Sequence, residues 1–159
     1  MKRFNWVGVG AGRMTLSQNI MGKKTFPFLK ESGCDYVVTL ISAHEGGERV
    51  GEMVKGIGLR WHWLPLRNGK TPTGEAKTML IEAFPILSQE LDRGASMLIH
   101  CAAGIHRTGM VAYTLLRWRG YNGAQSLDLI GQMRLFTREG VGQKRIEWGN
   151  GVIEETRHV

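Results

Sequence analysis

A cysteine and an arginine with five residues between them are the side chains best suited to covalent chemistry in this sequence. Cys101 opens a short loop that Arg107 closes, and the loop includes the small residues Ala102, Ala103 and Gly104. Small residues let successive backbone N–H groups turn to one side, where they form a nest for an anion. Such a setting lowers the pKa of a cysteine thiol from ~8.5 to as little as ~3.5–7.5, and the thiolate is the nucleophilic form.

The arginine supplies a clamp for the same anion. The planar guanidinium of Arg107 can hold two oxygens of a tetrahedral oxyanion in a bidentate arrangement. The helix expected to begin near Arg107 adds free N–H groups and the positive end of its dipole. Nucleophile, oxyanion cradle and clamp therefore fall within one short stretch of chain, which favours attack by sulfur on a bound oxyanion.

The stretch from His100 to Thr108 reads His-Cys-x5-Arg-Thr and resembles the active-site loop of cysteine-dependent protein phosphatases, specifically their compact dual-specificity branch. The resemblance implies that Cys101 attacks phosphorus, that Arg107 binds the equatorial oxygens, and that Thr108 helps the thiolate to leave in the second step. It also implies that His100 orders the loop. The phosphate-binding residues would then be Ala102, Ala103, Gly104, Ile105, His106 and Arg107.

Three further residues are given roles by the same resemblance or by their place in the loop. His106 either faces the pocket mouth, where it adds partial positive charge near pH 6–7, or is a solvated rim residue. The segment from Arg134 to Gln143 resembles a later helix and loop of the family. This implies a structural role for Arg134 and a role in placing the hydrolytic water for Gln143, with an ordinary surface loop as the alternative.

The segment from Pro65 to Pro72 departs from the family pattern. The family often reads Pro-x-x-Asp-Gly-x-x-Pro here, and its aspartate protonates the leaving oxygen. Asn68 occupies the place of that acid. A carboxamide can donate a hydrogen bond but cannot deliver a proton. General acid catalysis is typically worth ~10²–10⁴ in rate, so the substitution matters.

Four explanations of the missing acid compete. Glu75 or His62 supplies the proton from nearby, or the leaving group departs unaided, as an aryl phosphate or a polyphosphate end would. Otherwise the protein is a slow enzyme or a phosphate-binding module, or Asn68 is an engineered substitution. Arg67 and Lys70 on the same loop favour a highly anionic substrate, unless they belong to an ordinary charged surface.

Elements that alternate along the chain must position these residues. Strands are expected at 4–7, 36–41, 59–64 and 97–100, with the glycines after residue 7 forming a turn. Helices are expected to start at 26 and to cover 48–55, 73–93, 108–119 and 122–136, with a last one from about 143; Pro85 should kink or split the 73–93 helix. The alternation predicts an α/β fold, a three-layer sandwich whose central, mostly parallel sheet of 4–5 strands is flanked by helices. Ligands bind such sheets beyond the carboxyl ends of the strands, where Cys101 falls.

Composition sets the broad class. The 159 residues fit a single domain, 1–159, and no apolar run approaches the ~18–20 residues of a membrane span. The net charge of +7 favours anionic ligands such as phosphoesters, phosphoinositides or RNA. The two cysteines form no disulfide framework, which predicts a reducing, cytoplasmic location. Cys34 is either a resolving thiol for oxidised Cys101 or a small core residue.

Together these features predict a monomeric phosphatase that hydrolyses phosphomonoesters through a phosphocysteine on Cys101. The substrate expected is a phosphorylated protein, with a tyrosine or dual specificity. The alternatives are a phosphoinositide phosphatase or RNA 5′-triphosphatase with the same chemistry, and a catalytically weak phosphate-binding module. No His, Cys and Asp spacing suggests a metal site, and no cofactor is expected.

Overall fold

A five-stranded sheet forms the centre of the computed structural model, which describes residues 4–157. The strand order is β1 (Val7–Val9), β2 (Gly12–Ser17), β5 (Ser96–His100), β3 (Tyr36–Thr39) and β4 (Arg60–Trp63). Strand β1 is antiparallel to β2, and all other neighbours are parallel. The expected α/β fold with a mostly parallel sheet is therefore confirmed.

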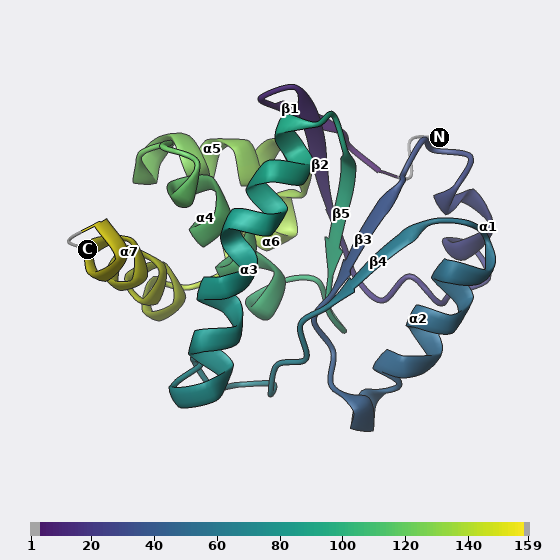
Figure 1. Cartoon of the computed structure of the whole chain (residues 1–159), viewed down its shortest axis with the longest axis horizontal. Coiled ribbons are helices and arrows are strands. Elements are labelled where there is room, and N and C mark those ends of the chain that lie inside the picture. Colours follow the sequence, from purple (N-terminus) through teal and green to yellow (C-terminus); the bar gives the residue numbers. More distant parts are fainter. Residues whose placement is uncertain (1–3, 158–159) are drawn as a thin grey trace.

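Helices cover both faces of the sheet and complete the three layers (Figure 1). Helices α1 (Phe26–Leu29) and α2 (Gly47–Gly56) lie on one face. The other face carries α3 (Gly74–Asp92), α4 (His106–Trp118), α5 (Gly123–Met133), α6 (Leu135–Gly140) and α7 (Gln143–Arg157). Helix α4 is the central one, and its residues 107–116 are all buried, as expected for a helix that is apolar on most sides.

The middle strands are buried on both faces, which explains their sequences. Every residue of β3 and of β5 is buried, because helices pack against the two faces of the sheet. Strands in that position read as continuous apolar runs rather than as alternating ones. Strand β5 delivers His100 and then Cys101 to the carboxyl edge of the sheet.

The first part of the chain differs from the expectation. Instead of one strand at 4–7, a hairpin joins β1 to β2 through a turn at Gly10, which has a φ of 61°. The turn interpretation is confirmed for Gly10, but Gly8 lies in β1, Gly12 begins β2, and strand β2 was missed. Its polar residues Thr15 and Ser17 are buried, and they break the apolar run that marks β3 and β5 in the sequence.

Two helix expectations need correction. Helix α3 runs unbroken through Pro85, which lies on its exposed face, where solvent can reach the carbonyl group that the proline leaves without its usual N–H partner. The helix expected at 122–136 is two helices, because Arg134 adopts an extended conformation with φ −162° and ψ 111° between α5 and α6. The start at Asn122 is confirmed, since its side chain accepts a hydrogen bond from the backbone N–H of Gln125.

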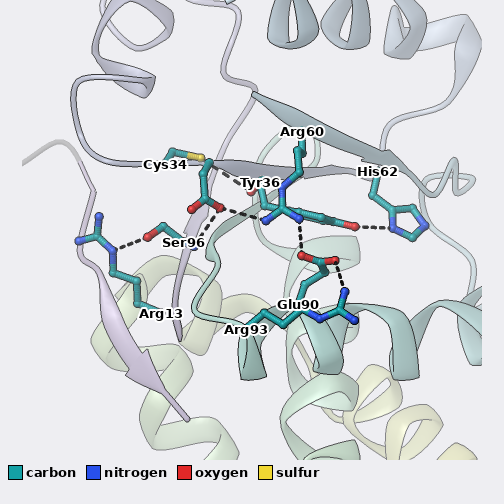
Figure 2. Close-up of polar contacts among 9 residues, drawn as sticks. Arg13, Cys34, Tyr36, Arg60, His62, Glu90, Arg93 and Ser96 are labelled. Carbon is teal, nitrogen blue, oxygen red and sulfur yellow. Dashed lines mark hydrogen bonds and ion pairs between the residues drawn. The ribbon is translucent and has the colours of Figure 1, made fainter. Parts of the chain in front are cut away.

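Polar contacts gather toward the amino-terminal edge of the sheet (Figure 2). Cys101 follows the last residue of β5 and so lies at the opposite edge. Arg60, at the start of β4, pairs with Glu90 of α3 and lies 4.9 Å from the ring centre of Tyr36. The Tyr36 hydroxyl is 3.0 Å from Nδ1 of His62. These contacts hold the edge strand β4 to its neighbouring strand and to helix α3.

Candidate active site

The candidate nucleophile sits between a strand and a helix. Cys101 directly follows β5 and is 2% exposed, and helix α4 begins at His106. The loop of residues 101–105 thus lies at the carboxyl edge of the sheet and at the amino end of a helix of 13 residues. This is the arrangement in which backbone N–H groups are free to face an anion.

Carbonyl groups of this loop are held by partners outside it. The oxygen of Cys101 lies 3.2 Å from Nδ1 of His100, and the oxygen of Ala102 accepts from the N–H of Asn19 at 2.9 Å. The oxygen of Gly104 accepts from the Arg134 guanidinium. In a trans peptide the C=O and the following N–H point in opposite directions. Outward carbonyls therefore turn N–H groups of the loop to its inner side, as an anion nest requires.

Gly104 is the residue that lets the loop close against the sheet. Its φ is 72°, and a Cβ atom there would lie 2.4 Å from the carbonyl oxygen of Ser17 in β2. The same Gly104 carbonyl accepts hydrogen bonds from Nη1 of Arg134, at 3.1 Å, and from the hydroxyl of Thr137. The structural role expected for Arg134 thus has a specific form, which is to fasten the loop to helix α6.

Arg107 is buried and is held by a carboxylate that sequence reasoning missed. Glu45, in the short 3₁₀ helix Ala43–Glu45, accepts from Nη1 of Arg107 at 2.6 Å and from Nη2 at 2.9 Å. The carbonyl of Leu66 accepts a further bond from Nη1 at 3.0 Å. Hydrogen bonding to Arg107 lowers the pKa of Glu45 to about 2. Ser42 and Glu45 form a capping box that is visible in the sequence, but nothing local indicates that this glutamate reaches Arg107.

These contacts leave one edge of the guanidinium open. Glu45 and Leu66 use both Nη1 protons and one Nη2 proton, so Nε–H and the second Nη2–H remain of the five donors. Those two N–H groups lie side by side and fit two oxygens of one phosphoryl group. Hydrogen bonding to Glu45 and the nearby Cys101 sulfur both raise the pKa of Arg107. The clamp is therefore cationic, oriented and beside the sulfur.

Two more residues of the motif are buried beside the loop. The imidazole of His100 is inaccessible to solvent, and burial lowers its pKa to about 4, so the ring is neutral at pH 7. Thr108, in the first turn of α4, is also buried. Its hydroxyl has no hydrogen-bond partner among residues 4–157, so it is free to donate to a group in the loop.

The residues considered for proton donation, and Asn68 at the position of the acid, are not buried as His100 and Thr108 are. Asn68 and Glu75 are exposed, Asn68 in a turn after β4 and Glu75 in the first turn of α3. His62 is half-buried, and its Nδ1 faces the Tyr36 hydroxyl (Figure 2). Burial lowers the pKa of His62. The structure therefore gives no reason to prefer His62 as the acid.

His106, at the end of the loop, and Gln143 are both exposed. Burial, Arg145 and Arg107 together lower the pKa of His106, so this ring carries less positive charge near pH 6–7 than the sequence suggested. Gln143 begins helix α7, and its amide lies 3.4 Å from a carboxylate oxygen of Glu147. In this arrangement the Gln143 amide donates to another residue of helix α7.

Cys34 lies at the other end of the sheet from Cys101. Its neighbour Asp35 bonds to the backbone of Ser96, the first residue of β5, whereas Cys101 follows the last. A parallel strand rises ~3.3 Å per residue, which puts roughly 16 Å between the two ends. Burial raises the pKa of Cys34 to about 12. A resolving role is therefore excluded in the folded state, and Cys34 is a buried core residue.

Comparisons with known proteins agree with this geometry. The family model described as "Polymorphic toxin system, DSP-PTPase phosphatase" matches residues 9–121. No curated protein matches the chain. Among the described residues, no helix is long and apolar enough to cross a membrane, and no group of three or more His, Cys, Asp or Glu side chains could hold a metal ion.

Solved structures share the fold at low identity. Tk-PTP in a mutant form is 19% identical, with a TM-score of 0.71 over 98% of this chain and 98% of that one. Kinase associated phosphatase (KAP), with its catalytic cysteine replaced by serine, is 19% identical, with a TM-score of 0.71 over 98% and 94%. The core catalytic domain of the PP-IP phosphatase SIW14 from S. cerevisiae is 18% identical, with a TM-score of 0.64 over 97% and 91%.

Proposed function

Because this chain belongs to the DSP-PTPase phosphatase family of polymorphic toxin systems, we propose that it hydrolyses phosphomonoesters through a phosphocysteine on Cys101. One observation carries the proposal. The buried Arg107 is fixed by Glu45 and Leu66 so that two N–H groups on one edge stay open beside the Cys101 sulfur. A guanidinium held in this way is suited to the two equatorial oxygens of a phosphoryl group.

In the first step the Cys101 thiolate attacks phosphorus, so a phosphorus–sulfur bond forms as the bond to the ester oxygen breaks. The inward N–H groups of the loop and the open edge of Arg107 stabilise the charge on the phosphoryl oxygens. In the second step water attacks phosphorus, inorganic phosphate is released, and sulfur leaves as thiolate. The unpaired hydroxyl of Thr108 donates a hydrogen bond to that sulfur as its charge returns.

The leaving oxygen decides which substrate fits best. No carboxylic acid stands at the position of Asn68, so the ester oxygen departs with little help from a general acid. A tyrosine phenol has a pKa near ~10 and leaves far more readily than an aliphatic alkoxide. We therefore favour a phosphotyrosine-containing protein over phosphoserine or phosphothreonine.

A second candidate is a highly anionic substrate, either a phosphoinositide or the 5′ end of RNA. The observation that favours it is the net charge of +7, with Arg67 and Lys70 exposed on the loop after β4. A polyphosphate end is also a good leaving group without an acid. One of the solved structures that share the fold is a PP-IP phosphatase.

The family description also suggests a biological setting. We propose that the protein acts as a toxic effector. We also propose that it works as a monomer in a reducing, cytoplasmic compartment, where the thiol of Cys101 stays reduced. Expression of the active protein in the cytoplasm of a bacterial host should then arrest growth, and the Cys101→Ser variant should not. Growth arrest by both proteins would assign the toxicity to something other than hydrolysis.

One panel of assays tests the activity and the substrate class together. Release of inorganic phosphate is measured from an aryl phosphate, a phosphotyrosine peptide, a phosphoserine peptide, a phosphoinositide and triphosphorylated RNA. We expect vanadate-sensitive turnover that is lost in Cys101→Ser and is fastest with the phosphotyrosine peptide. Binding without turnover on every substrate would refute the enzyme and support the phosphate-binding module.

A further inference from the structure

A line of hydrogen bonds connects the edge of the sheet to the catalytic loop. The indole Nε1 of Trp61, in β4, is 2.8 Å from the hydroxyl oxygen of Thr39 in β3. That oxygen is 2.7 Å from Nε2 of His100 in β5, and Nδ1 of His100 is 3.2 Å from the carbonyl oxygen of Cys101. Thr39 and His100 are both inaccessible to solvent. The line therefore crosses three strands and ends on the backbone of the nucleophile.

The direction of each hydrogen bond follows from what its ends can do. An indole N–H can only donate, so the Thr39 oxygen accepts from Trp61. The single Thr39 proton is then available for Nε2 of His100. At the other end, a carbonyl oxygen can only accept, so Nδ1 must carry a proton to bond with Cys101. The Cys101 end thus requires a proton on Nδ1 of His100, and the same tautomer, with a lone pair on Nε2, gives the Thr39 hydroxyl proton its acceptor.

Other protonation states of His100 fit this surrounding poorly. A proton on Nε2 alone would leave the Thr39 hydroxyl proton without its acceptor and would set the bare Nδ1 against the Cys101 carbonyl. Two buried polar groups would then lack partners, which is rare in native structures. A doubly protonated ring is disfavoured by burial, which lowers the pKa of His100 to about 4.

We propose that Trp61 is a positioning residue for the catalytic loop: its indole N–H, acting through Thr39, fixes the Nδ1–H tautomer of His100 and thereby the orientation of the peptide between Cys101 and Ala102. Because the N–H of Ala102 points away from the Cys101 carbonyl, this orientation aims it to the inner side of the loop. This inference rests on the proposed function, in which that N–H faces the phosphoryl group.

The strand that carries Trp61 also provides a matched control. Trp63 stacks on Trp61 with ring centres 5.6 Å apart, and its Nε1 donates to the carbonyl of Ile41 at 2.8 Å. A backbone carbonyl has no proton to pass on, so the Trp63 bond ends there. Trp61→Phe and Trp63→Phe therefore each remove one indole donor and disturb one stacked pair, but only the first change reaches His100.

The first measurement needs no variant. Proton-coupled ¹⁵N NMR of the histidine-labelled protein reports which ring nitrogen of His100 carries the proton, with assignment by the loss of the signal in His100→Asn. We expect the Nδ1–H form in the unliganded wild-type protein. A proton on Nε2 would overturn the proposal, whether or not the protein hydrolyses any phosphoester, which separates this failure from that of the proposed function.

The second measurement compares the variants. We record the His100 tautomer, the dissociation constant for inorganic vanadate, and the pH at which alkylation of Cys101 by iodoacetamide reaches half its limiting rate. The charged groups that act on the sulfur, Arg107 and Arg134, are the same in every variant, and so is Glu45, which pairs with Arg107. In Trp61→Phe we expect a mixture of tautomers, about tenfold weaker vanadate binding and an alkylation midpoint at higher pH. Removal of one oxyanion donor typically lowers kcat by ~10²–10³. We expect a smaller effect here because the Ala102 N–H stays in the loop and is only less firmly oriented.

Trp63→Phe should leave all three readouts at their wild-type values. Equal effects from the two tryptophan variants would refute the role of Trp61 and assign the change to the stacked pair. Changes at Thr39 provide an independent arm: Thr39→Ser keeps the hydroxyl and should retain the wild-type readouts, whereas Thr39→Val should behave like Trp61→Phe. A Thr39→Val protein with a pure Nδ1–H tautomer and normal vanadate binding would also refute the proposal.

Discussion

Replacement of Glu45 by glutamine tests how Arg107 is held. The change keeps the size of the side chain and removes the charge that pairs with the guanidinium at 2.6 and 2.9 Å. The pKa of Glu45 falls from 4.5 to about 2, and each unit of pKa corresponds to ~1.4 kcal/mol, so the pair contributes at most ~3.5 kcal/mol. The Glu45 side chain is 30% exposed, and solvent screening reduces this value to about 1–2 kcal/mol at pH 7.

The direction of the pKa shift of Glu45 determines how this stabilisation changes with pH. The pKa of Glu45 is lower in the folded than in the unfolded protein, so the stabilisation is complete above about pH 4.5 and is lost as the pH falls through about 2. We expect urea unfolding to show Glu45→Gln about 1–2 kcal/mol less stable than wild type at pH 7, and the two proteins to converge at about pH 2. Activity should fall roughly tenfold, because an Arg107 that can rotate no longer keeps its open edge toward phosphate.

A nearby glutamate provides the control. Glu48 is exposed in the first turn of α2, and Glu48→Gln should change the free energy of unfolding by less than ~0.5 kcal/mol at either pH. If Glu45→Gln lost the same stability at pH 2 as at pH 7, the loss would not come from the charge, and the reasoning from the ion pair would be wrong.

Three other changes test the remaining parts of the site. Asn68→Asp should raise the rate on a phosphoserine peptide by up to ~10²–10⁴ and leave an activated aryl phosphate nearly unchanged; an unaltered serine rate would show that Asn68 is not at the acid position. Gly104→Ala should lose at least tenfold in kcat/KM and lower the Tm, because the left-handed backbone costs ~1–2 kcal/mol and the new Cβ would lie 2.4 Å from the carbonyl oxygen of Ser17. Wild-type kinetics in this variant would contradict the packing of the loop. Cys34→Ala should leave both peroxide inactivation of Cys101 and its recovery by thiol unchanged, and slower recovery measured by residual activity would restore the resolving role.

The part of the site that sequence could predict is the part that is local in the chain. The family assignment is confirmed, and so is the placement of Cys101 directly after a buried strand. The geometry of the segment from His100 to Thr108 is determined by neighbouring residues, because a strand end, small loop residues and a helix start follow one another. The fully buried strands were also predictable, since β3 reads as a continuous apolar run.

The parts that could not be predicted depend on contacts between distant residues. Glu45 precedes Arg107 by 62 residues, and its sequence context indicates only a helix start. The break at Arg134 lies where its side chain bonds to the carbonyl of Gly104, 30 residues away, and no local residue pattern marks it. Strand β2 was missed because its buried polar residues are accommodated by packing that no short window of sequence reveals.

The fastening of Gly104 sets a lower limit on how much chain an active protein needs. Residues 9–121, which define the family match, contain the cysteine and the arginine but end before Arg134 and Thr137, the two side chains that hold the Gly104 carbonyl. A truncated protein that stops after α4 would keep every residue of the His-Cys-x5-Arg-Thr motif. It would lack the two side chains that bond to the Gly104 carbonyl and hold the catalytic loop in place. The shortest segment that can be recognised is therefore not the shortest segment that can work.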